Sequence, residues 1–264
     1  MVQAMIRHLD RAWRVVATGL SFFCFGVGGL CLRVLIFPLL QLLVRDPLRR
    51  KRLARQMVQA SFRFFIGLMR AMRVLTYEVR GLERLQRGGQ LILANHPTLL
   101  DVVFLVSLVP NADCVVRGGL ARNAFTRGPI QAAGYISNDS GLGLVEDCIA
   151  SVRRGGNLII FPEGTRTPRD GREIRLQRGA ANIAVRGRLD VTPIRIQCEP
   201  PTLSKGEKWY RVPPRRMHFT ISVDSDLAVD QIIGHGSSEA IAARRMTEYL
   251  YDYFFKESST HAGA

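Results

Sequence analysis

An uncharged apolar run, Val15–Leu32, restricts the possible structures of this chain more than any other stretch. As a helix that rises about 1.5 Å per residue, it would reach about 27 Å, close to the thickness of the hydrocarbon core of a bilayer. The run is too long for the apolar part of a signal peptide, and no small-x-small cleavage site follows it. We therefore predict a retained, membrane-associating helical region within residues 1–75.

Basic residues flank this run on both sides, with three arginines before it and six lysines or arginines within residues 45–55. A single span would leave the more basic side, and with it the main domain, in the cytosol. Positive charge on both flanks also fits a re-entrant hairpin that turns at Gly26–Gly29 or near Pro38. Both arrangements predict an inner, cytoplasmic membrane location with the main domain on the cytosolic face.

The charge of the chain is concentrated near its N-terminal end. Of a formal net charge of +15, residues 1–80 contribute 14 Lys or Arg against 3 Asp or Glu. At about 100° per residue, five arginines of the next segment share one side of a helix, opposite an apolar side: Arg52, Arg55, Arg63, Arg70 and Arg73. We interpret this segment as a basic amphipathic helix on an anionic membrane surface. The alternative is an ordinary helix that packs on the domain and exposes its arginines to solvent.

From Leu75 onward, strand-like and helix-like stretches alternate. The expected strands are LTYEV, QLILA, DCVVR, GYIS, NLIIF, VTPIRI and MHFTISV. The expected helices cover Leu99–Leu108, Leu142–Arg153, Ala180–Gly187 and Ser238–Phe255. This alternation predicts an α/β fold with a mixed, largely parallel sheet covered by helices. We assign residues 76–255 to a catalytic domain and 256–264 to a tail.

The five cysteines are odd in number and scattered, without a C-x-x-C pair or the spacing of zinc ligands. We interpret them as reduced, mostly buried thiols, which favours a cytosolic setting for the main domain. No metal or cofactor is expected.

A histidine and an aspartate follow the second predicted strand in the stretch LILANHPTLLD. Pro97 disfavours helical backbone at the residue before it, so His96 should lie on the loop between strand and helix. From there its imidazole can fold back to Asp101, which would fix the tautomer and leave the other ring nitrogen free to take a proton. The alternative is structural, because Thr98 and Asp101 also have the spacing of a capping box.

A second polar loop, FPEGTR, follows the strand NLIIF. It brings Glu163, Thr165 and Arg166 to a strand end, where sheets of this class place their sites. A carboxylate, a hydroxyl and a guanidinium suit a small polyol that bears a phosphate. The alternative is a polar turn with an incidental surface charge pair.

Together these stretches resemble the glycerol-phosphate and lysophosphatidic acid acyltransferase family. NHPTLLD is similar to the family's NH-x4-D block, FPEGTR to its FPEGTR block, and VTPIRI to a later V-x-P-I block, within residues 75–225. The resemblance implies that His96 is a general base, Asp101 its partner, and Asn95 and Pro193 residues that shape the site. It also implies that four residues bind the acceptor: Glu163, Gly164, Thr165 and Arg166.

One family block differs. Between the two others the family usually carries G-x-I-F-I-D-R, whose arginine contributes to phosphate binding, whereas the chain has GYISNDS with Ser140 at that place. Arg166 remains, and Arg117 and Arg122 are candidates to replace the missing arginine. The acceptor therefore stays open between 1-acyl-glycerol-3-phosphate, another lysolipid, and a different hydroxylated lipid such as an ornithine lipid or a polyene conjugate.

The expected activity is acyl transfer to a lipid hydroxyl, with acyl-CoA or acyl carrier protein as the donor and phosphatidic acid as the product. A hydrolase is disfavoured because the chain has no G-x-S-x-G elbow. A nucleoside triphosphatase is disfavoured because the chain has no G-x4-GK-[ST] loop. A non-catalytic, basic membrane protein that binds headgroups or nucleic acid explains the arginine-rich third but not the two polar loops. We therefore expect a membrane partner and no nucleic acid.

Overall fold

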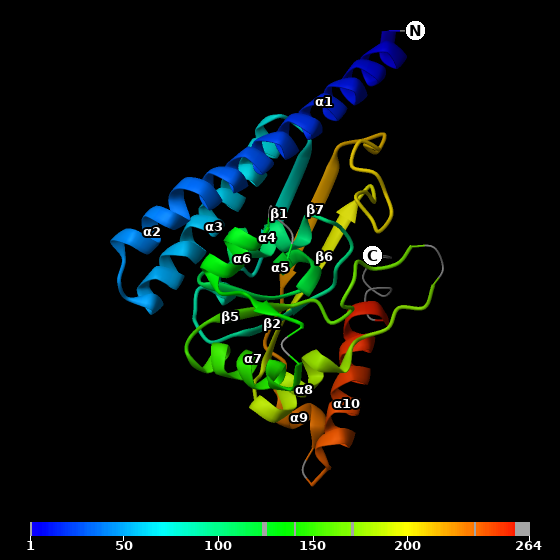
Figure 1. Cartoon of the computed structure of the whole chain (residues 1–264). Coiled ribbons are helices and arrows are strands. Elements are labelled where there is room, and N and C mark those ends of the chain that lie inside the picture. Colours follow the sequence, from blue (N-terminus) through cyan, green and yellow to red (C-terminus); the bar gives the residue numbers. More distant parts are fainter. Residues whose placement is uncertain (1, 123–125, 140, 170–171, 235, 257–264) are drawn as a thin grey trace.

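The computed structural model describes residues 2–122, 126–139, 141–169, 172–234 and 236–256. A seven-stranded sheet of order β1-β7-β6-β2-β5-β3-β4 lies at the centre, with helices on its two faces (Figure 1). Five of the six neighbouring strand pairs are parallel, and only β6 and β7 pair antiparallel. The predicted mixed, largely parallel α/β fold is confirmed. The strands are β1 (Leu75–Arg80), β2 (Leu91–Ala94), β3 (Ala112–Val116), β4 (Ile136–Ser137), β5 (Asn157–Ile160), β6 (Val191–Glu199) and β7 (Met217–Val223).

All seven predicted strands form, with ends shifted by a few residues. The α-helices are α1 (Val2–Cys31), α2 (Phe37–Leu43), α3 (Pro47–Ala71), α4 (Asp101–Leu108), α5 (Gly118–Arg122), α6 (Arg127–Ala133), α7 (Leu144–Arg153), α8 (Arg178–Gly187), α9 (Val229–Ile233) and α10 (Glu239–Tyr251). Short 3-10 turns are η2 (Leu82–Leu85) and η3 (Gly141–Gly143), and π-helical turns are η1 (Leu32–Ile36) and η4 (Asp252–Lys256). The sequence did not predict α5, α6 or α9. Of the predicted tail, residues 257–264 lie outside the described residues.

Alternating residues of the strands feed two separate cores, because successive side chains of a strand point to opposite faces of the sheet. Ile92 and Ala94 of β2 join a core with α3 and α4, whereas Leu91 and Leu93 join a core with α7, α8 and α10. Burial on both faces explains why this strand reads as a continuous apolar run rather than an alternating one. All five cysteines are free, and three of them are buried.

The N-terminal helix is continuous where the sequence allowed a turn. Helical backbone runs through Gly26–Gly29 and past Pro38, from α1 through η1 into α2. A re-entrant turn at either place is therefore wrong. Pro38 is tolerated because the preceding backbone forms a π-helical turn, in which the Phe37 N–H donates to the Leu32 carbonyl five residues earlier.

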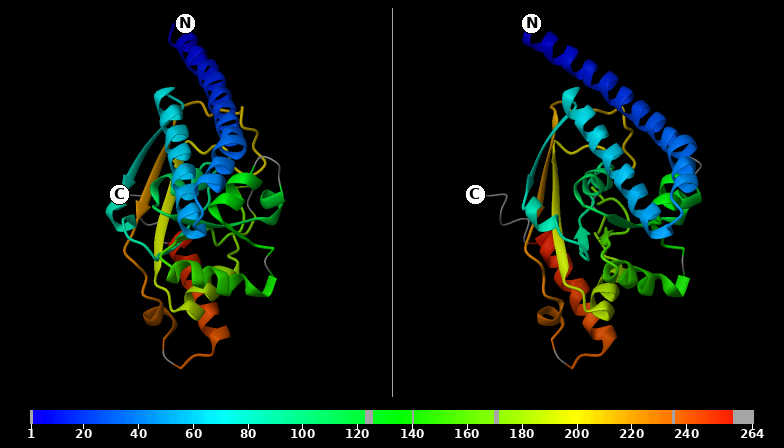
Figure 2. Two further views of the ribbon diagram at one scale, coloured as in Figure 1. Left: turned by 60° about the vertical axis from the view of Figure 1, so that its left-hand side comes forward. Right: turned by 90° about the vertical axis from the view of Figure 1, so that its left-hand side faces the viewer.

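The chain reverses instead at residues 44–46. Asp46 caps α3, since its carboxylate accepts from the backbone N–H groups of Leu48 and Arg49. Pro47 at the first helical position is pre-set for a helix start. As a result α3 returns beside α1 (Figure 2).

Helix α3 lies between α1 and the sheet domain and contacts both. Phe25 of α1 lies 5.5 Å from Phe62 and 4.7 Å from Phe65 of α3, measured between ring centroids. On the domain side, Arg55 is buried and forms a 2.5 Å ion pair with Asp113 of β3. The interpretation that all five arginines of this segment face headgroups or solvent is therefore wrong for Arg55.

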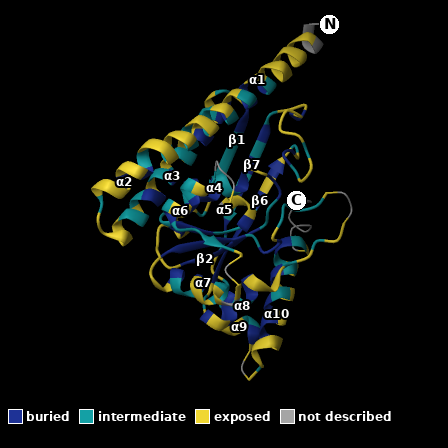
Figure 3. Cartoon of the chain, viewed as in Figure 1, coloured by how far each residue is buried: buried dark blue, intermediate teal, exposed yellow. Residues whose placement is uncertain are grey.

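A stripe of exposed apolar residues runs along α1 and into η1, and Figure 3 marks exposed residues along α1 in yellow. The members of this apolar stripe recur every three or four residues: Leu9, Trp13, Val16, Leu20, Phe23, Val27, Leu30 and Val34. Among the described residues, one helical run, Met5–Leu43, is long and apolar enough to cross a membrane, since it contains an 18-residue window with a mean hydropathy of 2.1. The stripe agrees with membrane association of this region.

Candidate active site

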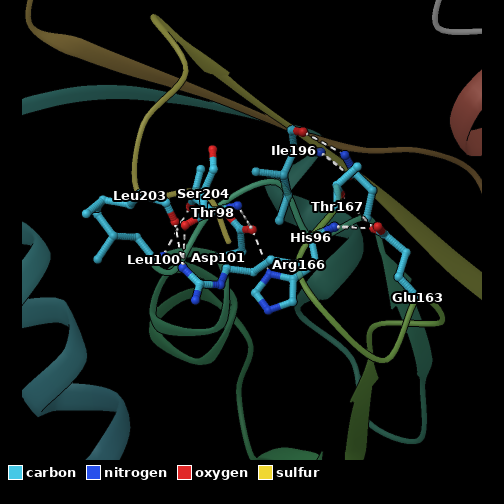
Figure 4. Close-up of polar contacts among 11 residues, drawn as sticks. His96, Thr98, Leu100, Asp101, Glu163, Arg166, Thr167, Ile196, Leu203 and Ser204 are labelled. Atoms are coloured by element: carbon cyan, nitrogen blue, oxygen red, sulfur yellow. Dashed lines mark hydrogen bonds and ion pairs between the residues drawn. The ribbon is translucent and has the colours of Figure 1, made fainter. Parts of the chain in front are cut away.

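The histidine and aspartate predicted from the sequence meet at the carboxyl end of β2. His96 Nδ1 lies 2.8 Å from Asp101 Oδ2 (Figure 4). The His96 side chain is 15% exposed, whereas that of Asp101 is fully buried. The pair thus has one buried member and one member that solvent can reach.

The structural alternative for Asp101 is realised at the same time. Asp101 Oδ2 accepts from the backbone N–H of Thr98 at 2.7 Å, and Oδ1 accepts from the Thr98 hydroxyl at 2.6 Å. Helix α4 begins at Asp101 rather than at the expected Leu99, because residues 98–100 form a turn held by these bonds. The Asp101 carboxylate therefore has two roles: it stabilises the turn before α4, and it forms a hydrogen bond with the His96 ring.

The environment of Asp101 affects its charge in two opposite ways. Burial raises the pKa of the Asp101 carboxyl above its ordinary value, while the bonds from His96 and Thr98 counteract the rise. A carboxylate can accept all three hydrogen bonds, whereas a protonated carboxyl would turn one acceptor into a donor. The three donors therefore favour the ionised form.

The imidazole of His96 is also held by a ring contact. Phe161, just after β5, stacks on it with ring centroids 4.2 Å apart and an interplanar angle of 28°. Within the described parts of the chain, Nε2 of His96 has no hydrogen-bond partner. The ring is thus fixed in orientation and leaves one nitrogen available to a substrate.

The backbone of His96 is fastened on both sides by the loop after β5. Glu163 Oε1 accepts from the His96 N–H at 2.8 Å and from the Thr167 hydroxyl at 2.9 Å. In return the Thr167 N–H donates to the His96 carbonyl at 2.7 Å. Strands β2 and β5 are parallel neighbours, so their carboxyl ends bring the two loops together. Thr167 was not predicted as a site residue, although it directly follows FPEGTR.

Glu163 is itself buried, and its second oxygen has no partner among the described residues. Burial raises the pKa of its carboxyl, and the bonds from His96 and Thr167 oppose the rise. The structure therefore gives Glu163 a positioning contact with His96. Its role in binding an acceptor stays a prediction.

The next residues form the rim of the site. Gly164 has φ +63°, a left-handed conformation that favours glycine, and it is exposed. Its carbonyl accepts from Nε of the exposed Arg117 at 3.1 Å. Thr165 follows and is half-buried.

Arg166 is directed toward a loop that the sequence did not connect with the site. Its Nη1 donates to the carbonyls of Leu203 and Ser204, each at 2.9 Å (Figure 4). The Leu203 carbonyl also accepts from the Leu99 N–H at 3.1 Å, in the turn between His96 and Asp101. This loop follows β6, and no residue pattern in it pointed to the site.

Asn95 and Pro193 occupy different depths in the sheet. Asn95 lies at the site edge, where its side chain accepts from the Ile196 N–H at 2.7 Å and donates to the Ile196 carbonyl at 2.9 Å. Pro193 is paired with Leu93, two residues deeper in β2, and is buried. Asn95 therefore continues the pairing of β2 with β6 beyond the last strand residue.

The block that differs from the family pattern is only partly described, because Ser140 lies outside the described residues. Of the two candidate replacements for its arginine, Arg122 is paired with Asp139 at 2.6 Å. Arg117 contacts the Gly164 carbonyl at the rim. Within the described ranges, no group of three or more His, Cys, Asp or Glu side chains is arranged to hold a metal ion.

Comparison with known proteins identifies relatives of the central part of the chain. Residues 76–197 match the family model described as Acyltransferase. A 1-acyl-sn-glycerol-3-phosphate acyltransferase of Pseudomonas aeruginosa is 30% identical over 146 residues, which cover 53% of this chain and 56% of that protein. The protein of the same name from Helicobacter pylori is 28% identical over 113 residues, or 40% and 48% of the two chains. The chain thus spans about half the length of the curated relatives it matches.

A solved structure resembles nearly the whole chain. It is the crystal structure of the 1-acyl-sn-glycerophosphate (LPA) acyltransferase PlsC from Thermotoga maritima, with a TM-score of 0.67 and 18% identity. The match covers 95% of this chain and 98% of that one. At this identity the likeness establishes a shared fold.

Proposed function

We propose that the chain, whose residues 76–197 match the Acyltransferase family model, transfers a fatty acyl group from a thioester to the free hydroxyl of 1-acyl-glycerol-3-phosphate. The observation that carries this proposal is the 2.8 Å contact between His96 Nδ1 and the buried Asp101 carboxylate. This contact fixes the tautomer with Nε2 unprotonated and directed away from Asp101, as a general base requires.

In the proposed reaction His96 Nε2 takes the proton of the acceptor hydroxyl as its oxygen attacks the thioester carbonyl carbon. The Asp101 carboxylate stabilises the imidazolium that forms. When the tetrahedral intermediate collapses, the carbon–sulfur bond breaks and the imidazolium gives its proton to the leaving thiolate. The acceptor oxygen is itself the nucleophile, so the reaction needs no acyl-enzyme intermediate.

Two sets of observations bear on the identity of the acceptor. The names of the two bacterial relatives point to 1-acyl-glycerol-3-phosphate, and exposed Arg117 offers a cation at the rim beside Gly164. Ser140 in place of the family's arginine favours the second candidate, a lysolipid or other hydroxylated lipid with a different headgroup. In either case Gly164, Thr165 and Arg166 would line the acceptor side, and acyl-CoA or acyl carrier protein would be the donor.

The proposal includes a location. Apolar helix α1 and the basic residues around it would hold residues 1–75 in the cytoplasmic membrane, with the catalytic domain of residues 76–255 on the cytosolic face. A lipid acceptor could then reach the site without crossing water.

Thioester consumption by the protein in vesicles tests the function. Lysophosphatidic acid and a panel of other hydroxylated lipids are compared as acceptors, with the released thiol and the acylated lipid both measured. His96→Ala should abolish turnover. The matched control is His218→Ala, since His218 lies on β7, where its Nδ1 contacts the Thr76 hydroxyl at 2.8 Å.

Phosphatidic acid that forms with wild type and His218→Ala, but not with His96→Ala, would support the full proposal. Turnover of a phosphate-free acceptor alone would retain the chemistry and replace the acceptor. Consumption that persists in His96→Ala would refute the assignment of the base.

A further inference from the structure

The connection between β6 and β7, residues 200–216, combines exposed aromatic and basic side chains. It holds five lysines or arginines and one acidic residue, Glu207. Trp209 is 46% exposed and Tyr210 is 45% exposed. Their rings contact each other edge to face at 5.7 Å, and Lys208 Nζ lies 5.6 Å from the centre of the Tyr210 ring. The cations are Lys205, Lys208, Arg211, Arg215 and Arg216.

This loop packs against α1 through two separate contacts. The buried Arg14 donates through Nη1 to the Pro213 carbonyl at 2.8 Å and through Nη2 to the Pro214 carbonyl at 2.9 Å. The Trp209 ring lies over Gly19, where an added Cβ would meet it at 3.3 Å, and its centroid is 6.2 Å from that of Phe22. The loop is therefore held beside α1 over two of its turns or more.

The packing places Trp209 next to the apolar stripe of α1. Gly19, which the ring covers, lies three residues after Val16 and four before Phe23 of that stripe, so on the helix surface it borders both. The half of the indole that remains exposed thus adjoins a continuous apolar surface. Figure 2 shows the loop reaching from the sheet toward α1.

We propose that residues 204–216 are a second membrane-contacting element, which seats Trp209 and Tyr210 at the headgroup level of an anionic bilayer and its cations on the lipid phosphates. The proposal rests on the membrane association that forms part of the proposed function. Tryptophan and tyrosine prefer the membrane–water interface because each ring has an apolar body and a polar tip. Clustered cations are attracted to the negative surface of the cytoplasmic leaflet.

A lipid surface fits this element better than an acidic protein does. An acidic partner would account for the cations but not for the apolar stripe beside them, which extends from Leu9 of α1 to Val34 of η1. A bilayer accounts for both, because its headgroups carry the charge and its acyl chains cover the apolar surface. Since Arg166 contacts Leu203 and Ser204 at the start of the loop, the same element would bring the membrane surface to the acceptor side of the site.

Two tryptophans in the sequence, Trp13 and Trp209, make the proposal testable by fluorescence. Trp13→Phe leaves Trp209 as the sole indole of the full-length protein. With phosphatidylglycerol vesicles its emission should shift to shorter wavelength, and lipids brominated near the headgroup should quench it more than lipids brominated near the chain end. Trp209→Phe leaves Trp13, a member of the apolar stripe, as a reporter of membrane contact by α1.

The charges are tested separately. Lys208→Gln with Arg211→Gln should weaken binding to anionic vesicles about 25-fold, at roughly fivefold for each cation, and should leave the low affinity for neutral vesicles unchanged. The control with the same loss of charge is Arg186→Gln with Arg188→Gln. These two residues lie around the end of α8, where they pair with acidic groups, and the control should bind as wild type does.

The outcomes separate the two levels of the hypothesis. If Trp13→Phe sediments with vesicles but its Trp209 emission is neither shifted nor quenched, the loop proposal is wrong and the membrane association stands. If neither single-tryptophan protein sediments with vesicles, the membrane association fails as well. A Trp209 shift produced by acyl carrier protein without lipid, and absent with vesicles, would overturn the proposal in favour of a protein partner.

Discussion

Replacing Asp101 with asparagine would remove the negative charge beside His96 while keeping the shape of the site. The amide oxygen can occupy the place of Oδ2, which accepts from His96 Nδ1 and the Thr98 N–H. The amide nitrogen then faces the Thr98 hydroxyl, which can turn to accept instead of donating. The substitution therefore isolates the electrostatic contribution of the carboxylate.

The expected loss follows from the stabilisation of the imidazolium. Two unit charges about 4 Å apart interact by about 4 kcal/mol at an effective dielectric constant of about 20. At about 1.4 kcal/mol for each tenfold change in rate, kcat should fall about 100- to 1000-fold. KM should stay within about twofold, because Asp101 is fully buried and has no surface for the acceptor to touch.

Initial rates of thiol release, measured over a range of acceptor concentrations, separate kcat from KM. The matched control is Thr98→Ser, which keeps the hydroxyl that donates to Asp101 and should retain nearly the full rate. Thermal melting should show Asp101→Asn folded, because burial raises the pKa of Asp101 and so disfavours the charge that the substitution removes.

Two results would contradict this reasoning. A kcat within threefold of the wild-type value would mean that Asp101 serves the helix entry alone. A large rise in KM at constant kcat would mean that the residue acts in binding.

Three further predictions concern buried groups. Burial raises the pKa of Glu163 above its ordinary value of 4.5, so the folded protein binds this proton more tightly than the unfolded chain does. The stabilisation that results is fully present at low pH and is lost as the pH rises through the pKa of the folded state. In urea unfolding Glu163→Gln should therefore gain stability relative to wild type between pH 4.5 and 7, and a constant difference would refute the shift. Arg55→Met leaves Asp113 buried and without its ion-pair partner, which should lower the unfolding free energy by about 3–5 kcal/mol. A second change, Asp113→Asn, should restore most of this loss, and equal stability of the single and double variants would contradict the reasoning. Burial raises the pKa of Cys148 and Cys198 to about 12, so a thiol reagent should leave both unmodified in the folded protein and modify both in guanidinium; rapid labelling of either in the folded state would argue against its burial.

The sheet could be predicted from the sequence because strands buried on both faces leave continuous apolar runs, such as LILA and NLII. The candidate site could be located because His96 and Glu163 each follow such a run. Parallel neighbouring strands bring their carboxyl ends to one edge, so both loops had to be close. What the pattern did not contain was the contact itself, in which the Glu163 carboxylate accepts from the backbone of His96.

The features that sequence analysis missed depend on partners far along the chain. The periodicity of α3 separates an arginine side from an apolar side but does not say which segments cover each side. In the structure, Arg55 is buried and forms an ion pair with Asp113. Likewise nothing in residues 200–216 marks Leu203 as a neighbour of Arg166. Both contacts depend on how distant segments of the chain pack together, which a residue pattern does not specify.

The fastening of His96 by the loop after β5 has a consequence for recombination between relatives. The His96 N–H donates to Glu163, and the His96 carbonyl accepts from the Thr167 N–H. Residues 95–101 and 161–167 therefore form one exchangeable unit, although they are distant in the chain. A hybrid that takes only one of the two segments from a relative would pair His96 with a Glu163–Thr167 loop adapted to a different backbone conformation. Altered acceptor preference should therefore be transplantable between family members only when both segments move together.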